Sequence, residues 1–304
     1  MEYKGYEVYE DGNRIIVRNI KDFNPVHTFE CGQCFRWVRE ADGSYTGVVR
    51  DKVVNIRCAN GGKELVIGNC SAEDFVNLWY HYFDLGRDYS RIKSMLSRKD
   101  GIMKKAVEFG EGIRLLRQDL WEVLISFIIS ANNRIPMIMK VIAILSETYG
   151  NKIMLGDKCY YTFPGIDRLA GENIDALKVC RGGFRCKYIL ETSRMIKDGE
   201  IDLNVLYKVG TGEAREILKK FPGVGSKVAD CILLYSGIKY DVFPTDVWVK
   251  RVMEELYFQR TASFKEIQEF ATTYFNGYAG FAQQYLFYYA RENKIGKDRN
   301  EQGR

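Results

Sequence analysis

The hydrophobic pattern of this 304-residue chain changes its period near residue 70. Between residues 6 and 70, short alternating runs such as RIIVRNI and SYTGVVRDKVVNIRC are separated by the turn-like sequences EDGN, EADGS and ANGGK. Alternation of apolar and polar residues between turns predicts antiparallel β-strands. From Ser71, a predicted helix cap, apolar residues recur at helical spacing in SAEDFVNLWYHYF and beyond. We therefore expect a sheet followed by a mostly helical region, in which YGNKIMLGDKCYYTFPG is a loop.

No stretch of the sequence predicts a membrane helix or an export signal. The most apolar region, VLISFIISANNRIPMIMKVIAIL, is broken by Asn132, Asn133, Arg134 and Pro136, so it lacks the roughly 18 uninterrupted apolar residues of a membrane span. The N-terminal residues MEYKGYEVYEDGN contain no apolar core either. The net charge of +5 is compatible with a polyanionic partner and equally with an ordinary solvated surface. We expect an intracellular protein, in the cytoplasm or the nucleoid if the organism is a prokaryote.

The eight cysteines are spread over the chain, which in the absence of an export signal indicates reduced thiols. Cys31 and Cys34 form a CxxC motif, but no second CxxC or histidine pair supplies the other ligands of a zinc site. Cys180 and Cys186 are more widely spaced, and further cysteines do not follow at the short intervals of an iron–sulfur site. We expect no zinc and no iron–sulfur cluster.

The segment REILKKFPGVGSKVADCILLYSG predicts two helices joined by a tight turn, a hairpin that we place at residues 213–236. Pro222 cannot continue the first helix, and Gly223 and Gly225 allow backbone conformations that other residues resist. The N–H groups of such a turn and of the following helix can approach a phosphate closely. The turn is also compatible with a simple connector between helices.

Lys227 lies in the first turn of the second helix, where the helix dipole disfavours a cation. An amine that is partly desolvated near this positive end loses basicity and becomes a better nucleophile. Asp246, in VFPTDVWVKRV, lies at the predicted start of the next helix, where its carboxylate is stabilised as the anion. Cys231 lies one turn after Lys227 on the same helix face. The pattern fits a nucleophile with an anionic stabiliser and, equally well, a solvated lysine with a capping aspartate.

Both segments resemble those of one enzyme group. FPGVGSKVADC and VFPTDVWVKRV are similar to the helix-hairpin-helix motif, glycine/proline-rich loop and aspartate of the DNA glycosylase superfamily, and specifically of its 8-oxoguanine DNA glycosylase family. Further segments resemble that family in the same order: ECGQCFRW, IRLLRQDLWEVLISFIISANNRI, GGFRCKYI and GYAGFAQQYLFYYAR. The resemblance implies an α+β fold. An N-terminal antiparallel sheet domain with helices, TATA-binding-protein-like, would span residues 1–115, an all-α helix-hairpin-helix glycosylase domain 116–292, and a polar tail 293–304.

The resemblance implies a bifunctional DNA glycosylase and AP lyase that acts as a monomer on double-stranded DNA containing 8-oxoguanine. Lys227 would attack the sugar of a flipped-out nucleotide, release the base, form a Schiff base and eliminate the 3′ phosphate. Asp246 would stabilise the positive charge on the sugar. Two alternatives stay open. One is an endonuclease III-type glycosylase for oxidised pyrimidines, although its cluster-binding cysteine run is missing here, and the other is a non-catalytic helix-hairpin-helix DNA-binding protein.

The resemblance also assigns the residues that would read the base. The backbone carbonyl of Gly32 would accept a hydrogen bond from N7–H of 8-oxoguanine, a donor that guanine lacks. Gln283 would read the Watson–Crick edge, while Phe287 and Cys231 would contact the two faces of the purine. By residue type alone, Gly32 is a turn glycine and the Gln283–Phe287 pair is ordinary core packing.

Further residues are assigned to the DNA by the same resemblance. Asn132, with Asn133 beside it, would fill the gap left by the base and contact the orphaned partner, and a helix C-terminal cap is the alternative. Phe184 would wedge into the base stack, and Arg185 would also contact the orphan base. The remaining predicted DNA contacts are Met137, Gly223, Gly225 and Trp248. The only cofactor expected is a structural alkali cation on the backbone carbonyls of Lys219, Phe221 and Val224.

Three positions depart from well-known eukaryotic members of the family. Met137 stands where they have an arginine that reads the orphan cytosine, Phe184 replaces a tyrosine, and Trp248 replaces a histidine. Because a thioether cannot donate hydrogen bonds to cytosine, we predict weak discrimination of the opposite base. The replacement by Trp248 leaves the phosphate contact at that position open.

Overall fold

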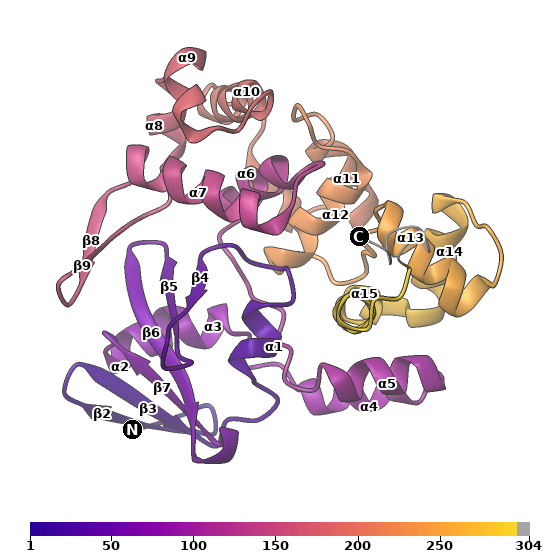
Figure 1. Ribbon diagram of the computed structural model, residues 1–304, viewed down its shortest axis with the longest axis horizontal. Helices are drawn as coiled ribbons and strands as arrows, with labels where there is room; N and C mark the ends of the chain where they lie inside the picture. The colour runs from indigo at the N-terminus through magenta and orange to yellow at the C-terminus, as the bar shows by residue number, and fades with distance from the viewer. Residues whose placement is uncertain (297–304) are drawn as a thin grey trace.

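The computed structural model describes residues 1–296, so that the last part of the predicted tail, 297–304, lies outside the described residues. The predicted antiparallel sheet is confirmed, and its strands lie in the order β1-β2-β3-β7-β6-β5-β4 (Figure 1). Each neighbouring pair of strands is antiparallel. The strands are β1 (Glu2–Tyr3), β2 (Tyr6–Asp11), β3 (Arg14–Arg18), β4 (Trp37–Arg39), β5 (Tyr45–Val49), β6 (Lys52–Ala59) and β7 (Glu64–Gly68).

The sheet buries one face because its apolar residues alternate along neighbouring strands. Ile15 pairs with Ile67 and Val17 with Leu65, and all four side chains are buried. The same core contains aromatic residues of the helical segment that follows the sheet. This segment consists of α2 (Ala72–Asp74), a π-helical turn (Phe75–Trp79) and α3 (Tyr80–Tyr82). Ser71 and Asp74 form a capping box at its start, which confirms the predicted helix cap. The short helix α1 (Pro25–Phe29) precedes the loop that leads from the sheet toward the second core.

The second core is helical, as predicted, and α6 (Leu120–Ser130) runs through it. Leu124, Ile125, Ile128 and Ile129 of this helix have no exposed surface, so α6 is enclosed on nearly all sides. The other helices of this part are α4 (Tyr89–Ser97), α5 (Gly101–Phe109), α7 (Ile135–Tyr149), α8 (Ile166–Ala170), α9 (Ile174–Leu177), α10 (Arg185–Lys197), α11 (Thr211–Leu218), α12 (Ser226–Tyr235), α13 (Val247–Met253), α14 (Phe264–Phe275) and α15 (Ala279–Glu292). Helices α7, α10 and α12 pack against α6, and Figure 1 shows the hairpin α11–α12 next to α13. Short 3₁₀ turns lie at Asn60–Gly62, Lys178–Cys180, Leu203–Tyr207 and Asn276–Tyr278, and a π-helical turn at Glu254–Phe258.

The two cores do not correspond to two consecutive parts of the sequence. Helices α4 and α5 precede residue 115, yet their buried side chains belong to the helical core, and Cys31 and Phe35 belong to it as well. Leu116 packs in the core of the sheet. The chain therefore crosses between the cores more than once, and the domain boundary at residue 115 stays a prediction.

One predicted loop is wrong. Residues in YGNKIMLGDKCYYTFPG form a two-stranded hairpin of β8 (Lys152–Leu155) and β9 (Lys158–Tyr161). The reversal is made at Gly156, whose φ of +57° is readily adopted by glycine. The half-buried residues of the hairpin pack against α7 and the sheet. These distant contacts stabilise the two short strands, and the local sequence pattern does not reveal them. Among the described residues, no helix is long and apolar enough to cross a membrane.

Candidate active site

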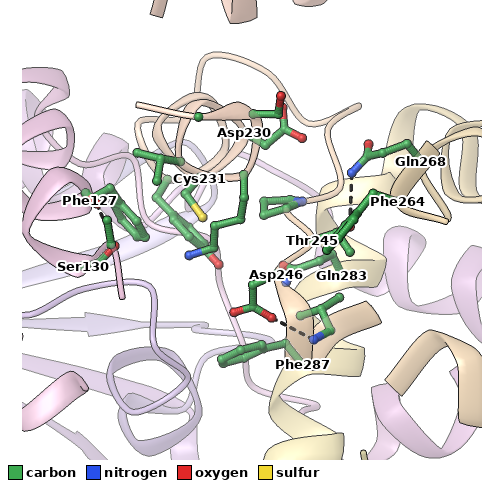
Figure 2. Close-up of a pocket in the computed structure, with 18 of the residues that line it drawn as sticks. Phe127, Ser130, Asp230, Cys231, Thr245, Asp246, Phe264, Gln268, Gln283 and Phe287 are labelled. Atoms are coloured by element: carbon green, nitrogen blue, oxygen red, sulfur yellow. Dashed lines mark hydrogen bonds between the residues drawn. The ribbon is translucent and has the colours of Figure 1, made fainter. Parts of the chain in front are cut away.

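A cavity of about 1470 Å³ lies between the sheet-derived loop at Gly32 and helices α6, α12, α13, α14 and α15. Figure 2 shows side chains from several of these elements pointing toward one space. Ten residues that the sequence analysis assigned to the site line it, although they come from widely separated segments. They are Gly32, Asn132, Asn133, Gly225, Lys227, Cys231, Asp246, Trp248, Gln283 and Phe287.

Lys227 lies in the first turn of α12, and its Nζ atom is 5.7 Å from the centre of the Phe127 ring. Its pKa is raised above the ordinary lysine value, and the largest cause is the Cys231 side chain in its thiolate form, which predominates only above about pH 11. Burial opposes this shift, and the nearby Asp246 carboxylate adds to it. The predicted loss of basicity is therefore wrong for the free protein, since the two acidic groups outweigh burial. In this state the amine is held as a cation.

Asp246 has two roles that the sequence analysis treated as alternatives. It is the N-cap of α13, where its Oδ1 atom accepts a hydrogen bond of 2.8 Å from the Val249 N–H. Figure 2 shows its carboxylate next to the Phe287 ring and directed into the cavity that also contains Cys231. Capping occupies one lone pair of one oxygen and fixes the side chain, so the carboxylate can also act electrostatically on a cation in the cavity.

Cys231 faces the same space from α12 and is almost fully buried. Burial raises the pKa of its thiol to about 11, so the protonated form prevails at neutral pH. A buried thiol of this kind presents a small polarisable surface to whatever occupies the cavity.

Gln283 and Phe287 lie one turn apart on α15, as predicted. Gln283 is 3% exposed, and within the described residues its Oε1 atom has no hydrogen-bond partner. A buried amide oxygen without a partner costs free energy, and a ligand with a hydrogen-bond donor would recover it. The Phe287 ring meets the Trp248 ring edge to face, with 5.1 Å between centroids. The two aromatic side chains form one wall of the cavity.

Gly32 is held by residues that the sequence analysis did not identify. The fully buried Gln33 donates to the carbonyls of Thr28 and Arg114 and accepts from the Leu116 N–H, each at 2.8 Å. Gln284 donates to the Cys31 carbonyl at 2.9 Å and accepts from the Tyr235 hydroxyl at 2.9 Å. One sequence signal could have indicated these two residues. Each is a glutamine within an otherwise apolar segment, Gln33 inside CGQC and Gln284 next to Gln283.

The CxxC cysteines next to Gly32 are packing groups in this structure. Cys31 and Cys34 are buried, and their thiols donate to the carbonyls of Thr28 and Phe29. Burial raises the pKa of Cys31 to about 12, which disfavours the thiolate that a metal requires. Within residues 1–296, no group of three or more His, Cys, Asp or Glu side chains could hold a metal ion.

The predicted orphan-base residues lie at the ends of α6 and α10. Asn132 has a left-handed φ of +51° and an exposed side chain that makes no hydrogen bond within the described part of the chain. Asn133 donates to the Ile129 carbonyl at 3.2 Å and accepts from the Arg134 N–H, so it closes the end of α6. The capping alternative thus describes Asn133, while Asn132 is free to contact another molecule.

Two further predicted contacts are exposed apolar side chains outside the cavity. Phe184 is 59% exposed and Met137 is 47% exposed. Large apolar groups at a surface are typical of interaction sites. Arg185 is different, because its guanidinium donates to the carbonyls of Ala131 and Asn132 within the protein.

The predicted hairpin is confirmed as helix, turn and helix, formed by α11 and α12. Gly223 has a φ of +81°, and a Cβ atom there would lie 2.6 Å from Cδ2 of Tyr188. At Gly225, by contrast, a Cβ atom would meet nothing within 4 Å, so its lack of a side chain leaves the start of α12 open to a ligand. Among the three carbonyls proposed to hold a cation, that of Phe221 accepts the Val224 N–H at 3.1 Å. The cation site stays a prediction.

These observations define a class of protein. A helical hairpin that presents a lysine to a deep cavity, with a capping aspartate opposite, is the arrangement of a helix-hairpin-helix DNA glycosylase. Residues 15–124 match the family model described as 8-oxoguanine DNA glycosylase, N-terminal domain. The chain belongs to the 8-oxoguanine DNA glycosylase family, as the following relatives show.

The probable N-glycosylase/DNA lyase of Methanothermobacter thermautotrophicus is 32% identical over 243 residues, which cover 73% of this chain and 77% of the relative. The N-glycosylase/DNA lyase OGG1 of Arabidopsis thaliana is 30% identical over 284 residues, covering 86% and 75%. A solved structure of Clostridium acetobutylicum 8-oxoguanine glycosylase/lyase, in complex with duplex DNA containing cytosine opposite 8-oxoG, is 49% identical with a TM-score of 0.92. It covers 95% of this chain and 99% of that chain.

Proposed function

We propose that this enzyme excises 8-oxoguanine from duplex DNA with Lys227 as the nucleophile and then cleaves the strand as an AP lyase. The observation that carries the proposal is the position of Lys227 at the start of α12, in one cavity with Asp246, Cys231 and the unpaired Gln283 amide. Membership of the glycosylase family supports the reaction class. The remaining steps are derived from the chemistry of these groups.

The proposed reaction begins when the damaged nucleotide is extruded into the cavity, because its glycosidic bond is unreachable within the base stack. The Lys227 amine must first lose its proton. Its nitrogen then bonds to C1′ as the glycosidic bond breaks, and the base leaves with the bonding electrons and takes up a proton. Asp246 stabilises the positive charge that develops on the sugar. Opening of the sugar ring gives a Schiff base, from which loss of a C2′ proton expels the 3′ phosphate.

The base is selected by hydrogen bonding and stacking. N7 of 8-oxoguanine carries a hydrogen, whereas N7 of guanine is an acceptor. The carbonyl of Gly32 accepts no hydrogen bond within the described residues and lies beside the cavity, where it would pair with the lesion and repel guanine. The unpaired Gln283 amide would take the Watson–Crick edge, with Phe287 and Cys231 on the two faces of the purine.

The DNA backbone is proposed to bind at the hairpin. The turn around Gly225 and the free N–H groups at the start of α12 would receive a phosphate, assisted by an alkali cation on the carbonyls of Lys219, Phe221 and Val224. We propose that the enzyme needs no other cofactor, acts as a monomer and works inside the cell.

The orphan base is proposed to be contacted by Asn132 and Met137, with Phe184 wedged beside it. Because the Met137 thioether donates no hydrogen bonds, excision rates opposite C, A, G and T should lie within about tenfold of one another. Met137→Arg should introduce a preference for cytosine of about 1–3 kcal/mol, the worth of a bidentate base contact. Single-turnover excision from four duplexes measures this. Strict dependence of the wild-type enzyme on cytosine would contradict the prediction.

The nucleophile is tested by incubation with borohydride and an 8-oxoguanine duplex, which reduces a Schiff base to a stable adduct. We expect an adduct with the wild type, none with Lys227→Gln, and an undiminished yield per bound enzyme with Lys220→Gln, which alters an exposed lysine of the same hairpin. A duplex with an oxidised pyrimidine serves as the second substrate. Preference for that duplex would favour an endonuclease III-type enzyme, and binding with neither an adduct nor base release would favour a non-catalytic DNA-binding protein.

A further inference from the structure

Asp246 follows a segment of chain that has few hydrogen bonds of its own. Residues 242–245, which lead from α12 to Asp246, form neither helix nor strand, and all four are buried. Within residues 1–296, none of them makes a hydrogen bond from one backbone group to another. Because buried backbone groups need partners, a side chain that supplies one has a strong influence on where the segment lies.

Gln268 supplies that partner from the middle of α14. Its Nε2 atom donates to the Phe243 carbonyl and, at 3.1 Å, to Oγ1 of Thr245 (Figure 2). The Thr245 hydroxyl donates to the same carbonyl at 2.9 Å, so the three groups form a closed triangle. In the described part of the chain, no other residue outside 242–245 makes a hydrogen bond to the segment. The Phe243 ring also stacks on Phe275 of α14, with 6.1 Å between centroids.

This triangle lies directly before the carboxylate that faces the cavity. Thr245 is joined to Asp246, which caps α13 through the Val249 N–H. The cap fixes the carboxylate relative to α13, whereas Lys227 belongs to α12. The position of Asp246 relative to Lys227 therefore depends on the segment that connects the two helices. Gln268 holds that segment against a third helix, α14.

We propose that Gln268 is a positioning residue for the excision reaction, which holds residues 242–245 against α14 and thereby sets the distance between the Asp246 carboxylate and the sugar that Lys227 attacks. The inference rests on the proposed function, in which Asp246 stabilises the positive charge on that sugar. Such stabilisation depends on the distance between the charges and is strongest where water is excluded. The loss of Gln268 should therefore slow the chemical step without weakening DNA binding in proportion.

The first test separates chemistry from binding. Gln268→Met keeps the side-chain volume and removes the donor, so the single-turnover excision rate at saturating enzyme should fall by about tenfold or more. The Kd for a duplex whose 8-oxoguanosine carries a 2′-fluorine, which resists excision, should stay within about twofold of the wild-type value. Glu269→Gln, at the exposed neighbouring position of α14, is the control and should leave the rate unchanged. A loss of affinity as large as the loss of rate would show a direct DNA contact and overturn the inference.

A double-mutant cycle tests whether the effect passes through Asp246. Asp246→Asn keeps a capping oxygen but removes the charge. In that background, Gln268→Met should have less than a third of its single-mutant effect, because the charge that it positions is gone. Fully additive effects, or a wild-type rate in Gln268→Met, would refute the inference.

Two further outcomes distinguish this inference from its basis. If urea denaturation shows that Gln268→Met is unfolded, Thr245→Val, which removes one corner of the triangle, serves in its place with a smaller expected loss of rate. Failure of the wild type on every 8-oxoguanine duplex, or a wild-type rate in Asp246→Asn, would instead refute the proposed function or the role of Asp246 within it.

Discussion

Gly32 illustrates how much one residue contributes when it has no side chain. Its φ of +88° is in the region that favours glycine, and a Cβ atom would lie 3.2 Å from Cε1 of Phe287. The same atom would lie 3.5 Å from Nη1 of Arg291. The absence of a side chain therefore lets the carbonyl at this position and the Phe287 ring line the same cavity.

We predict that Gly32→Ala loses excision activity as well as stability. The control is Gly43→Ala, at a φ of +83° with nothing within 4 Å of the added Cβ, so it reproduces the backbone strain alone. Both variants should be destabilised by about 1–2 kcal/mol in urea unfolding. Only Gly32→Ala should lower the single-turnover excision rate, by roughly tenfold or more, because only there is the stacking ring displaced. Equal rates for the two variants would contradict this explanation.

The raised pKa of Lys227 predicts a pH dependence. Below that pKa the amine is protonated and cannot attack, so the excision rate should rise from about pH 6 to about pH 9, by up to tenfold per unit. Over this range the charge that acts on Lys227 is that of Asp246, because the Cys231 thiol, with a pKa of about 11, stays neutral. Cys231→Ser should therefore leave the profile in place. A rate that does not change over this range would show that deprotonation of Lys227 does not limit the reaction.

The direction of that pKa could not be predicted from the local sequence. The helix dipole at Lys227 is a property of neighbouring residues, whereas the opposing charge of Asp246 arrives from another helix. Asp246 itself could be predicted as a cap, because capping depends on residues within three positions. Likewise, Asn132 and Asn133 were identified as a pair, but only the structure separates the capping residue from the free one.

At the scale of elements, the hairpin α11–α12 has a turn whose two glycines serve different purposes. Gly223 packs against Tyr188 of α10, and its φ of +81° is in the left-handed region. Gly225 has ordinary backbone angles and open space around it. The sequence predicted the turn from Pro222 and both glycines, but it could not assign one glycine to packing and the other to ligand access.

This difference predicts two distinct phenotypes. Gly223→Ala should lower the free energy of unfolding by about 2–3 kcal/mol, because the added carbon would overlap the Tyr188 ring. Gly225→Ala should unfold at nearly the wild-type urea concentration but bind duplex DNA more weakly, since its methyl group stands where a phosphate is proposed to approach. Urea unfolding and DNA titration at fixed salt separate the two effects. Wild-type affinity in Gly225→Ala would argue against a phosphate at this turn.

The elements that were predicted well have a strong local signal. The sheet has alternating strands and turn residues, and the helix after Ser71 has its capping box. The β8–β9 hairpin was missed because four-residue strands carry little periodicity and because α7 and the sheet, which support it, are distant in sequence.

At the scale of the whole molecule, the loop between α1 and β4 joins the two cores. It leaves the sheet part, places Cys31 and Phe35 in the helical core and returns to Trp37 in β4. Gln33 anchors this loop through three buried hydrogen bonds to backbone groups of Thr28, Arg114 and Leu116. The relation between the cores was invisible in the sequence, because it depends on contacts between residues about eighty positions apart.

We predict that Gln33→Met, which keeps the side-chain volume but removes the donors and acceptor, lowers the free energy of unfolding by about 2–4 kcal/mol. It should also lower the rate of 8-oxoguanine excision, since Gly32 is its neighbour. The borohydride adduct with an abasic duplex should be nearly unchanged, because that reaction needs Lys227 and no base contact. Equal losses on both substrates would show that Gln33 supports the fold in general and has no particular effect on Gly32.

The placement of the Gly32 loop between the cores has a consequence for fidelity. The group proposed to recognise the lesion belongs to a connection anchored by Gln33 and Gln284, whereas Lys227 and Asp246 belong to helices of one continuous core. Loss of these anchoring hydrogen bonds, as in Gln33→Met, should displace the Gly32 carbonyl while the helices that carry Lys227 and Asp246 stay in place. Such an enzyme would lose its selectivity for the lesion before it lost its ability to cleave DNA.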